Sequence, residues 1–133
     1  MAKWTARATN IGPTAFSGEI RGHRITGDVP EELGGHNAGA LPPEWLPTAL
    51  AGCMGTVIAL ACRERGVPYD GMTVEVECDD ITDEHRLANF KMKITMPETL
   101  TEHDRQVVVA AESLCRVRNT LMHGAEVTVE VAP

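Results

Sequence analysis

Residues 48–62 form the longest stretch of the chain without a charge or a proline, and apolar side chains would occupy nearly every side of a helix there. Several prolines and Glu44 precede this stretch, and the charges and glycine of residues 63–66 follow it. These are start and stop signals of a helix. A helix that is apolar on nearly every side is buried inside protein. We expect a core helix and not a membrane span, because the stretch contains glycine and is shorter than the roughly 20 apolar residues that cross a bilayer.

Alternating apolar and polar residues predict strands in the rest of the chain. The alternation is clearest over residues 72–78 and 90–96, and a hairpin of the two would set the lysines of the second against the glutamates of the first. Weaker patterns predict strands over residues 4–9 and 16–29, and a closing strand over residues 127–131.

Two further segments complete the expected order of elements. Residues 30–43 are rich in glycine and proline and predict a long loop that leads into the core helix, and loops of this length are usually functional. Thr101 followed by Asp104 resembles a capping box, so a second helix should follow with Cys115 on its buried face. The pattern predicts a single α+β domain over residues 1–133 with antiparallel sheets.

The core helix also indicates a dimer. One sheet with a single apolar face and one helix of modest length cannot cover a helix that is apolar all round. A second copy of the chain is the simplest cover for the remaining side.

The net charge of the chain limits the classes of partner that we expect. Lys plus Arg is 12 and Asp plus Glu is 19, which gives 12 − 19 = −7. With no basic tract, we expect neither nucleic acid nor an anionic membrane as a partner. The first residues have no apolar segment of a secretory signal, so we expect a cytoplasmic protein whose cysteines are mostly reduced.

The cysteines are the candidate chemistry. They include no Cys-x-x-Cys pair and no histidine at ligand spacing, so neither a metal site nor a cofactor is expected. On a helix Cys53 shares a face with Leu50 and Val57, along with Leu46 and Leu60. Cys62 points to the opposite side about 13 Å along the axis, too far for a disulfide with Cys53. From periodicity alone, Cys53 is more simply interpreted as a buried core residue than as a reactive one.

Several motifs together resemble the OsmC/Ohr family of thiol-dependent hydroperoxide reductases, in order and over nearly the whole chain. They are Glu32-Leu33-Gly34-Gly35, Pro43-Glu44-Trp45-Leu46, Ala49-Leu50-Ala51-Gly52-Cys53-Met54 and Ala111-Glu112-Ser113-Leu114-Cys115. The resemblance implies an intertwined homodimer in which antiparallel sheets wrap two long central helices from each chain. It also implies active sites at the subunit interface.

The same resemblance assigns roles to particular residues. Cys53 would be the peroxidatic cysteine, Cys115 the resolving one and Glu44 the carboxylate that organises the site. The family commonly adds an arginine from the N-terminal strands, and Arg21 is our first choice, ahead of Arg24 and Arg7. The implied substrate is an organic hydroperoxide, and the implied partner is a small dithiol or a thiol protein as reductant.

One departure from the family pattern follows the second cysteine. Arg116 stands where many relatives have proline, which favours a helix that continues through Cys115. Two alternatives stay open at this point. One is an OsmC-like dimer that binds a small apolar or thiol ligand without turnover, and the other is a hot-dog thioesterase, which also wraps a sheet around a buried helix.

Overall fold

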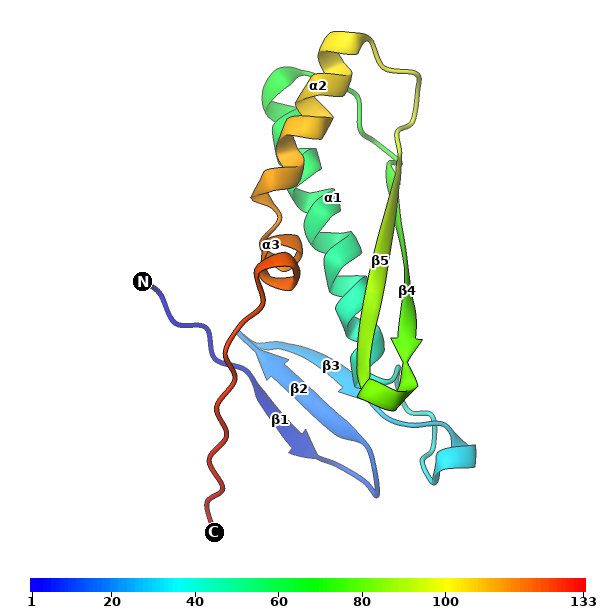
Figure 1. The fold of residues 1–133 in the computed structure, drawn as a ribbon, viewed down its shortest axis with the longest axis vertical. Coiled ribbons are helices and arrows are strands. Elements are labelled where there is room, and N and C mark those ends of the chain that lie inside the picture. The colour runs from blue at the N-terminus through cyan, green and yellow to red at the C-terminus, as the bar shows by residue number, and fades with distance from the viewer. The chain divides into compact units, whose positions relative to one another are not determined.

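The computed structural model describes all residues 1–133, which divide into two compact units, Met1–Leu46 and Pro47–Pro133 (Figure 1). Both units are built on antiparallel sheets, and helices accompany the sheet of the second, so the α+β class is confirmed. The interpretation of residues 1–133 as a single domain stays a prediction.

The first unit is a three-stranded sheet in the order β1 (Arg7–Asn10), β2 (Phe16–Ile20) and β3 (His23–Gly27). Arg21 and Gly22 join β2 to β3 with φ angles of 51° and 81°. Two consecutive positive φ angles make a tight hairpin turn of the kind that matches the twist of paired strands. The expectation of Arg21 on a strand is therefore wrong, because the predicted segment 16–29 folds back on itself at this residue.

A buried carboxylate holds the loop that follows β3. The Asp28 side chain is 1% exposed and accepts hydrogen bonds from the Thr14 hydroxyl at 2.6 Å and from the Val29 amide at 2.7 Å. The amides of His36 and Ala38 donate to its other oxygen, each at 3.1 Å. Its backbone amide donates to the Ala40 carbonyl oxygen as well, so one residue joins both ends of the predicted loop.

The long helix α1 (Trp45–Arg65) follows a short 3-10 turn, η2 (Pro42–Glu44). Pro47 lies in the first turn of α1, where an amide would have no acceptor within the helix, so the proline breaks no hydrogen bond. From η2 to Arg65 the helical segment has 24 residues and a mean hydropathy of 1.6 in its most apolar window. Length and composition alone would let it cross a membrane, so the expectation that it is too short was wrong; the core helix of a globular protein meets the same criteria.

In the second unit α1 lies between a β-hairpin on one side and helix α2 on the other (Figure 1). The hairpin pairs β4 (Thr73–Ile81) with β5 (Arg86–Thr95). Glu75 lies opposite Lys93 and Glu77 opposite Lys91, which confirms the predicted hairpin and its register.

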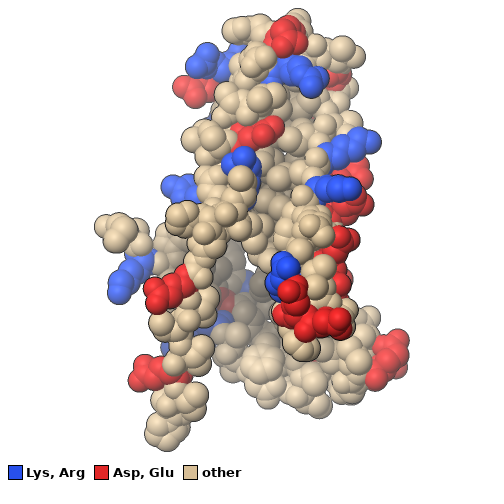
Figure 2. All heavy atoms as spheres, viewed as in Figure 1, with Lys and Arg blue, Asp and Glu red and all other residues tan.

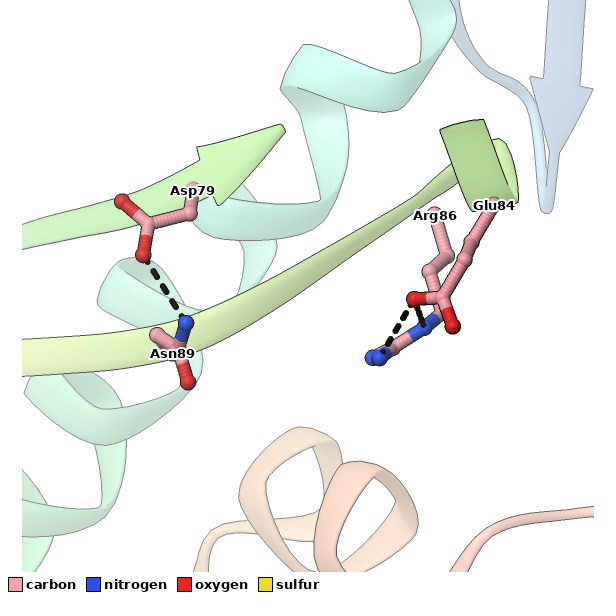
Figure 3. A network of polar contacts seen from close by, with 4 residues as sticks. All are labelled: Asp79, Glu84, Arg86 and Asn89. Carbon is pink, nitrogen blue, oxygen red and sulfur yellow. Dashed lines mark hydrogen bonds and ion pairs between the residues drawn. The ribbon is translucent and has the colours of Figure 1, made fainter. Parts of the chain in front are cut away.

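A bulge interrupts the hairpin after Glu77. Asn89 adopts a φ of 56° there, and its side-chain amide donates to the Asp79 carboxylate at 2.9 Å (Figure 3). An asparagine tolerates this left-handed conformation better than most residues do. At the hairpin tip, Arg86 forms an ion pair with Glu84 at 2.8 Å (Figure 3).

The second helical region is broken. Helix α2 (Glu102–Ala111) begins at the predicted cap, where the Thr101 hydroxyl accepts from the Asp104 amide at 3.1 Å. A 3-10 turn, η4 (Glu112–Leu114), follows it, and then α3 (Arg116–His123). The helical path is therefore interrupted at Cys115 although the next residue is Arg116, which corrects the expectation of a continuous helix.

One side of α1 is buried in the core of the second unit. The buried residues of α1 recur every fourth position: Leu50, Met54, Ile58 and Cys62. Cys53 and Val57 pack against this core but are only partly buried, and Leu60 is 49% exposed. The face of α1 predicted to be buried is therefore displaced by about one residue from the face that is buried in the structure.

Residues 124–133 form no strand in the structure of the single chain, so the predicted closing strand over residues 127–131 is wrong for the single chain. The three valines of the alternating pattern, Val127, Val129 and Val131, are between 82% and 91% exposed. Charged side chains on the face shown in Figure 2 are of mixed sign, and acidic residues gather along the β4–β5 hairpin.

Candidate functional site: a thiol pair at a helix start

The structure brings Cys53 and Cys115 together in the second unit. Cys53 lies in the first half of α1 and is partly buried, and Cys115 is completely buried in the same core cluster. Both are free thiols. Cys115 has extended backbone angles, φ −78° and ψ 106°, and is the N-cap residue of α3.

The break before α3 is made without proline. Asn119 reaches back from α3, and its side-chain amide donates to the carbonyl oxygen of Ser113 at 2.9 Å. The Cys115 sulfur accepts a hydrogen bond from the Arg118 amide at 3.4 Å, as the oxygen of a serine would at an N-cap. These contacts satisfy backbone groups that the interruption of the helix would otherwise leave unpaired.

The surroundings of Cys53 favour its thiolate. Burial by itself would raise its pKa, but hydrogen bonds from the Val117 amide, the Cys115 thiol and the Arg116 amide act in the other direction. The positive charge of Arg116 adds to them, and together these groups hold the pKa of Cys53 below its usual value.

The surroundings of Cys115 favour its protonated form. Burial is the largest cause that raises its pKa, and the neighbouring Cys53 adds to the effect. The hydrogen bond from the Arg118 amide opposes the shift without reversing it. The two pKa shifts are opposite in direction, so the surroundings favour the thiolate at Cys53 and the protonated thiol at Cys115.

Neither of the other cysteines belongs to this pair. Burial and the charge of Asp104 raise the pKa of the Cys62 thiol, which has no exposed surface. Cys78 lies on β4. No group of three or more His, Cys, Asp or Glu side chains is arranged to hold a metal ion.

The two other predicted site residues belong to the first unit. Glu44 ends η2, where its carboxylate accepts the amide of Leu41 at 2.7 Å. Arg21 occupies the exposed turn between β2 and β3, and Arg24 lies 4.0 Å from Glu19 on the exposed strands. Their roles beside Cys53 stay predictions.

Sequence reasoning missed the residues that surround the thiols. Arg116 was considered only as a missing proline, and Asp28 was not singled out. The contribution of the α3 amides could not be anticipated, because it depends on a helix break that the sequence pattern does not predict.

This fold and site define a class: a small α+β protein with a partly buried thiol on a central helix and a fully buried thiol at the start of another. The family model described as "OsmC-like protein" matches residues 35–130, and the chain belongs to this family. Membership of this family replaces the hot-dog thioesterase alternative.

Solved structures show the same fold. A putative osmotic stress induced and detoxification response protein from Psychrobacter arcticus superposes with a TM-score of 0.77 at 24% identity, over 90% of this chain and 89% of that one. An OsmC-like protein from Mycoplasma pneumoniae gives 0.70 at 19% identity, over 91% and 88%. The organic hydroperoxide resistance protein OhrB of Bacillus subtilis gives 0.59 at 16% identity, over 90% of each chain. No curated protein matches the chain in sequence.

Proposed function

We propose that this protein detoxifies peroxides by reducing organic hydroperoxides, with Cys53 as the peroxidatic cysteine and Cys115 as the resolving one. The observation that carries the proposal is the placement of two free thiols at one core cluster, Cys53 on α1 and Cys115 at the start of α3, and their pKa shifts of opposite direction support it. A peroxidatic sulfur must be a thiolate to attack, and a resolving thiol must stay reduced until the attack is over. Relatives of the same fold that are named organic hydroperoxide resistance proteins support the substrate class.

The proposed reaction uses the two thiols and an external reductant. The Cys53 thiolate attacks the outer oxygen of the hydroperoxide, the O–O bond breaks, and the alkoxide leaves as an alcohol after taking a proton. The sulfenic acid on Cys53 then condenses with the Cys115 thiol, which forms a disulfide and releases water. A dithiol or thiol protein reduces that disulfide by exchange and is itself oxidised.

Glu44 and Arg21 complete the proposed site as the organising carboxylate and its cationic partner. The proposal also includes a homodimer in a cytoplasmic setting, where small thiols and thiol proteins are available as reductants. Two sets of residues support a second copy of the chain: the exposed valines of the C-terminal segment, and Leu60 on the outer side of α1. Apolar groups in such numbers are costly to leave in water.

The test is consumption of cumene hydroperoxide in the presence of a dithiol reductant. Cys53→Ser should abolish turnover, and Cys115→Ser should allow a first turnover and then accumulate over-oxidised Cys53, measured by intact mass. Cys78→Ser is the matched control and should retain the native rate, because Cys78 lies outside the thiol pair. Equal rates for the native protein and Cys53→Ser would leave the ligand-binding dimer without turnover as the function.

A further inference from the structure

The loop of residues 29–40 is held from the inside by the Asp28 carboxylate. One of its oxygens accepts from the Thr14 hydroxyl and the Val29 amide, and the other accepts from the amides of His36 and Ala38. A carboxylate only accepts hydrogen bonds, so it suits a position that four donors share. Because the backbone donors lie at both ends of the loop, one side chain fixes the course of the whole segment.

The loop passes so close to its neighbours that two of its positions have no room for a side chain. A Cβ atom at Gly35 would lie 2.8 Å from an Asp28 carboxylate oxygen and 2.7 Å from Cγ2 of Val29. A Cβ atom at Gly39 would collide with the backbone carbonyl of Thr26. Real side chains essentially never approach so closely, so the glycines allow the loop to close around Asp28.

The end of this loop is tied to the end of β3. The Asp28 amide donates to the Ala40 carbonyl oxygen at 3.1 Å, and Gly27 and Ala40 form an isolated parallel bridge. Pro42, the first residue of η2, lies against Gly27, where a Cβ atom would be 3.0 Å from its ring. The position of η2, which carries Glu44, therefore follows from the contacts made at Gly27 and Asp28.

Leu41 connects this end of the loop to the Glu44 carboxylate. The Leu41 amide donates to one Glu44 carboxylate oxygen at 2.7 Å, and the Glu44 amide donates to the Leu41 carbonyl oxygen at 2.8 Å. The direction of the carboxylate thus follows the backbone of Leu41, the residue after Ala40. All contacts from Asp28 to Glu44 lie within the first unit.

We infer that Asp28 is a positioning residue for Glu44: it holds the end of the loop from which the Glu44 carboxylate is presented. The inference rests on the proposed function, in which Glu44 is the organising carboxylate, and adds a residue that acts through it. The two thiols belong to the second unit, so a change at Asp28 would alter the reaction through Glu44 and not through Cys53 or Cys115.

The test is a double-mutant cycle of Asp28→Asn and Glu44→Gln in the full-length protein. Asparagine at this position would direct an amide donor at backbone amides of the loop and release its end. The kcat/KM for cumene hydroperoxide is measured for the native protein, both single variants and the double variant, at a temperature where all four are folded. A second readout needs no activity: the change that Glu44→Gln makes in the NMR shift of the Leu41 amide, with and without Asp28→Asn.

Asp28→Asn should lower kcat/KM by about ten-fold in the otherwise native protein, because a misplacement of about 1 Å can cost up to about 100-fold. In the Glu44→Gln background the same substitution should cost less than about two-fold, since the group that it positions is already changed. The shift change at Leu41 should be smaller in the presence of Asp28→Asn. Glu31→Gln is the matched control: it removes a charge from the exposed 3-10 turn η1 (Glu31–Leu33) of the same loop and should alter neither readout.

Thr14→Val keeps the cycle informative if Asp28→Asn does not fold, because it removes one donor to Asp28 and leaves the loop amides in place. Its loss in kcat/KM should be smaller, should be restored by Thr14→Ser and should also depend on Glu44.

Equal losses in the native and Glu44→Gln backgrounds would overturn the inference, since they would show that Asp28 does not act through Glu44. A Leu41 shift change that is the same with and without Asp28→Asn would overturn it as well. If the native protein consumes no hydroperoxide, the proposed function is rejected, and the Leu41 readout alone decides whether Asp28 positions Glu44.

Discussion

Asn119 and Ser113 are joined across the break between α2 and α3 by a hydrogen bond of 2.9 Å from the Asn119 side chain to the Ser113 carbonyl oxygen. The two bonded residues lie on either side of Cys115, the residue that carries the second thiol. A proline after Cys115 would interrupt the helix by steric exclusion. The hydrogen bond from Asn119 instead stabilises the interrupted arrangement. The placement of Cys115 beside Cys53 follows from that interruption.

Asn119→Ala should weaken this placement. Losing the hydrogen bond costs about 1 kcal/mol, which corresponds to about a fivefold smaller population of the arrangement that joins the two thiols. Disulfide formation after one equivalent of hydroperoxide should slow by a similar factor, measured by quenched thiol trapping. Thr120→Ala is the control, because its hydroxyl bonds within α3 to the Arg116 carbonyl oxygen and does not cross the break. Equal slowing in both variants would contradict the role of Asn119.

Asp28→Asn should destabilise the protein in a pH-dependent way. A hydrogen bond from the Thr14 hydroxyl, together with those from backbone amides, holds the pKa of the Asp28 carboxyl well below its usual range. A lowered folded-state pKa contributes stability that is full above the unfolded value of about 3.9 and is lost as the pH falls toward the folded value. The stability difference between native protein and variant should therefore be largest near neutral pH and shrink below about pH 4.

Urea unfolding at pH 7, 4 and 3 measures this difference. Asp83→Asn, in the exposed 3-10 turn at the hairpin tip, is the control and should change stability little. A difference between native protein and Asp28→Asn that stays constant from pH 7 to pH 3 would contradict the role of the Asp28 charge.

Arg21→Asn should stabilise the hairpin of β2 and β3. Arg21 has a φ of 51° and precedes Gly22, and Asn-Gly is the preferred pair for this turn. The gain should be up to about 1 kcal/mol, since non-glycine residues other than Asn and Asp pay about that much for a left-handed conformation. Thermal unfolding measures it. The same variant in the peroxide assay tests the proposed role of Arg21, because a more stable protein with lost turnover would assign the arginine to the site.

Val127→Glu with Val129→Glu should prevent dimer formation. Both side chains are more than 80% exposed in the single chain, and their alternation is that of a strand with one apolar face. Charges on that face would be buried by a second copy at high cost. Light scattering after gel filtration should show a monomer for this variant and a dimer for Thr128→Glu, whose side chain would point to the other face of such a strand. A dimer in both cases would exclude this segment from the interface.

The sequence by itself determined the local elements. Strict alternation predicted the hairpin and set Glu75 against Lys93, because a register slip of one residue would turn the apolar face outward. Thr101 and Asp104 predicted where α2 begins, since a cap depends on neighbouring residues only. The motifs around the two cysteines identified the family.

Only the tertiary structure decided the rest. A helix that is apolar all round has no preferred face, so packing alone chose Leu50, Met54 and Ile58 as the buried side of α1. Across the break at Cys115 the Asn119 side chain bonds to the Ser113 carbonyl oxygen, and amides of the following turn lower the pKa of Cys53. Contacts made by the folded chain, and not the pattern of residue types, therefore determine which of the two thiols has the lower pKa.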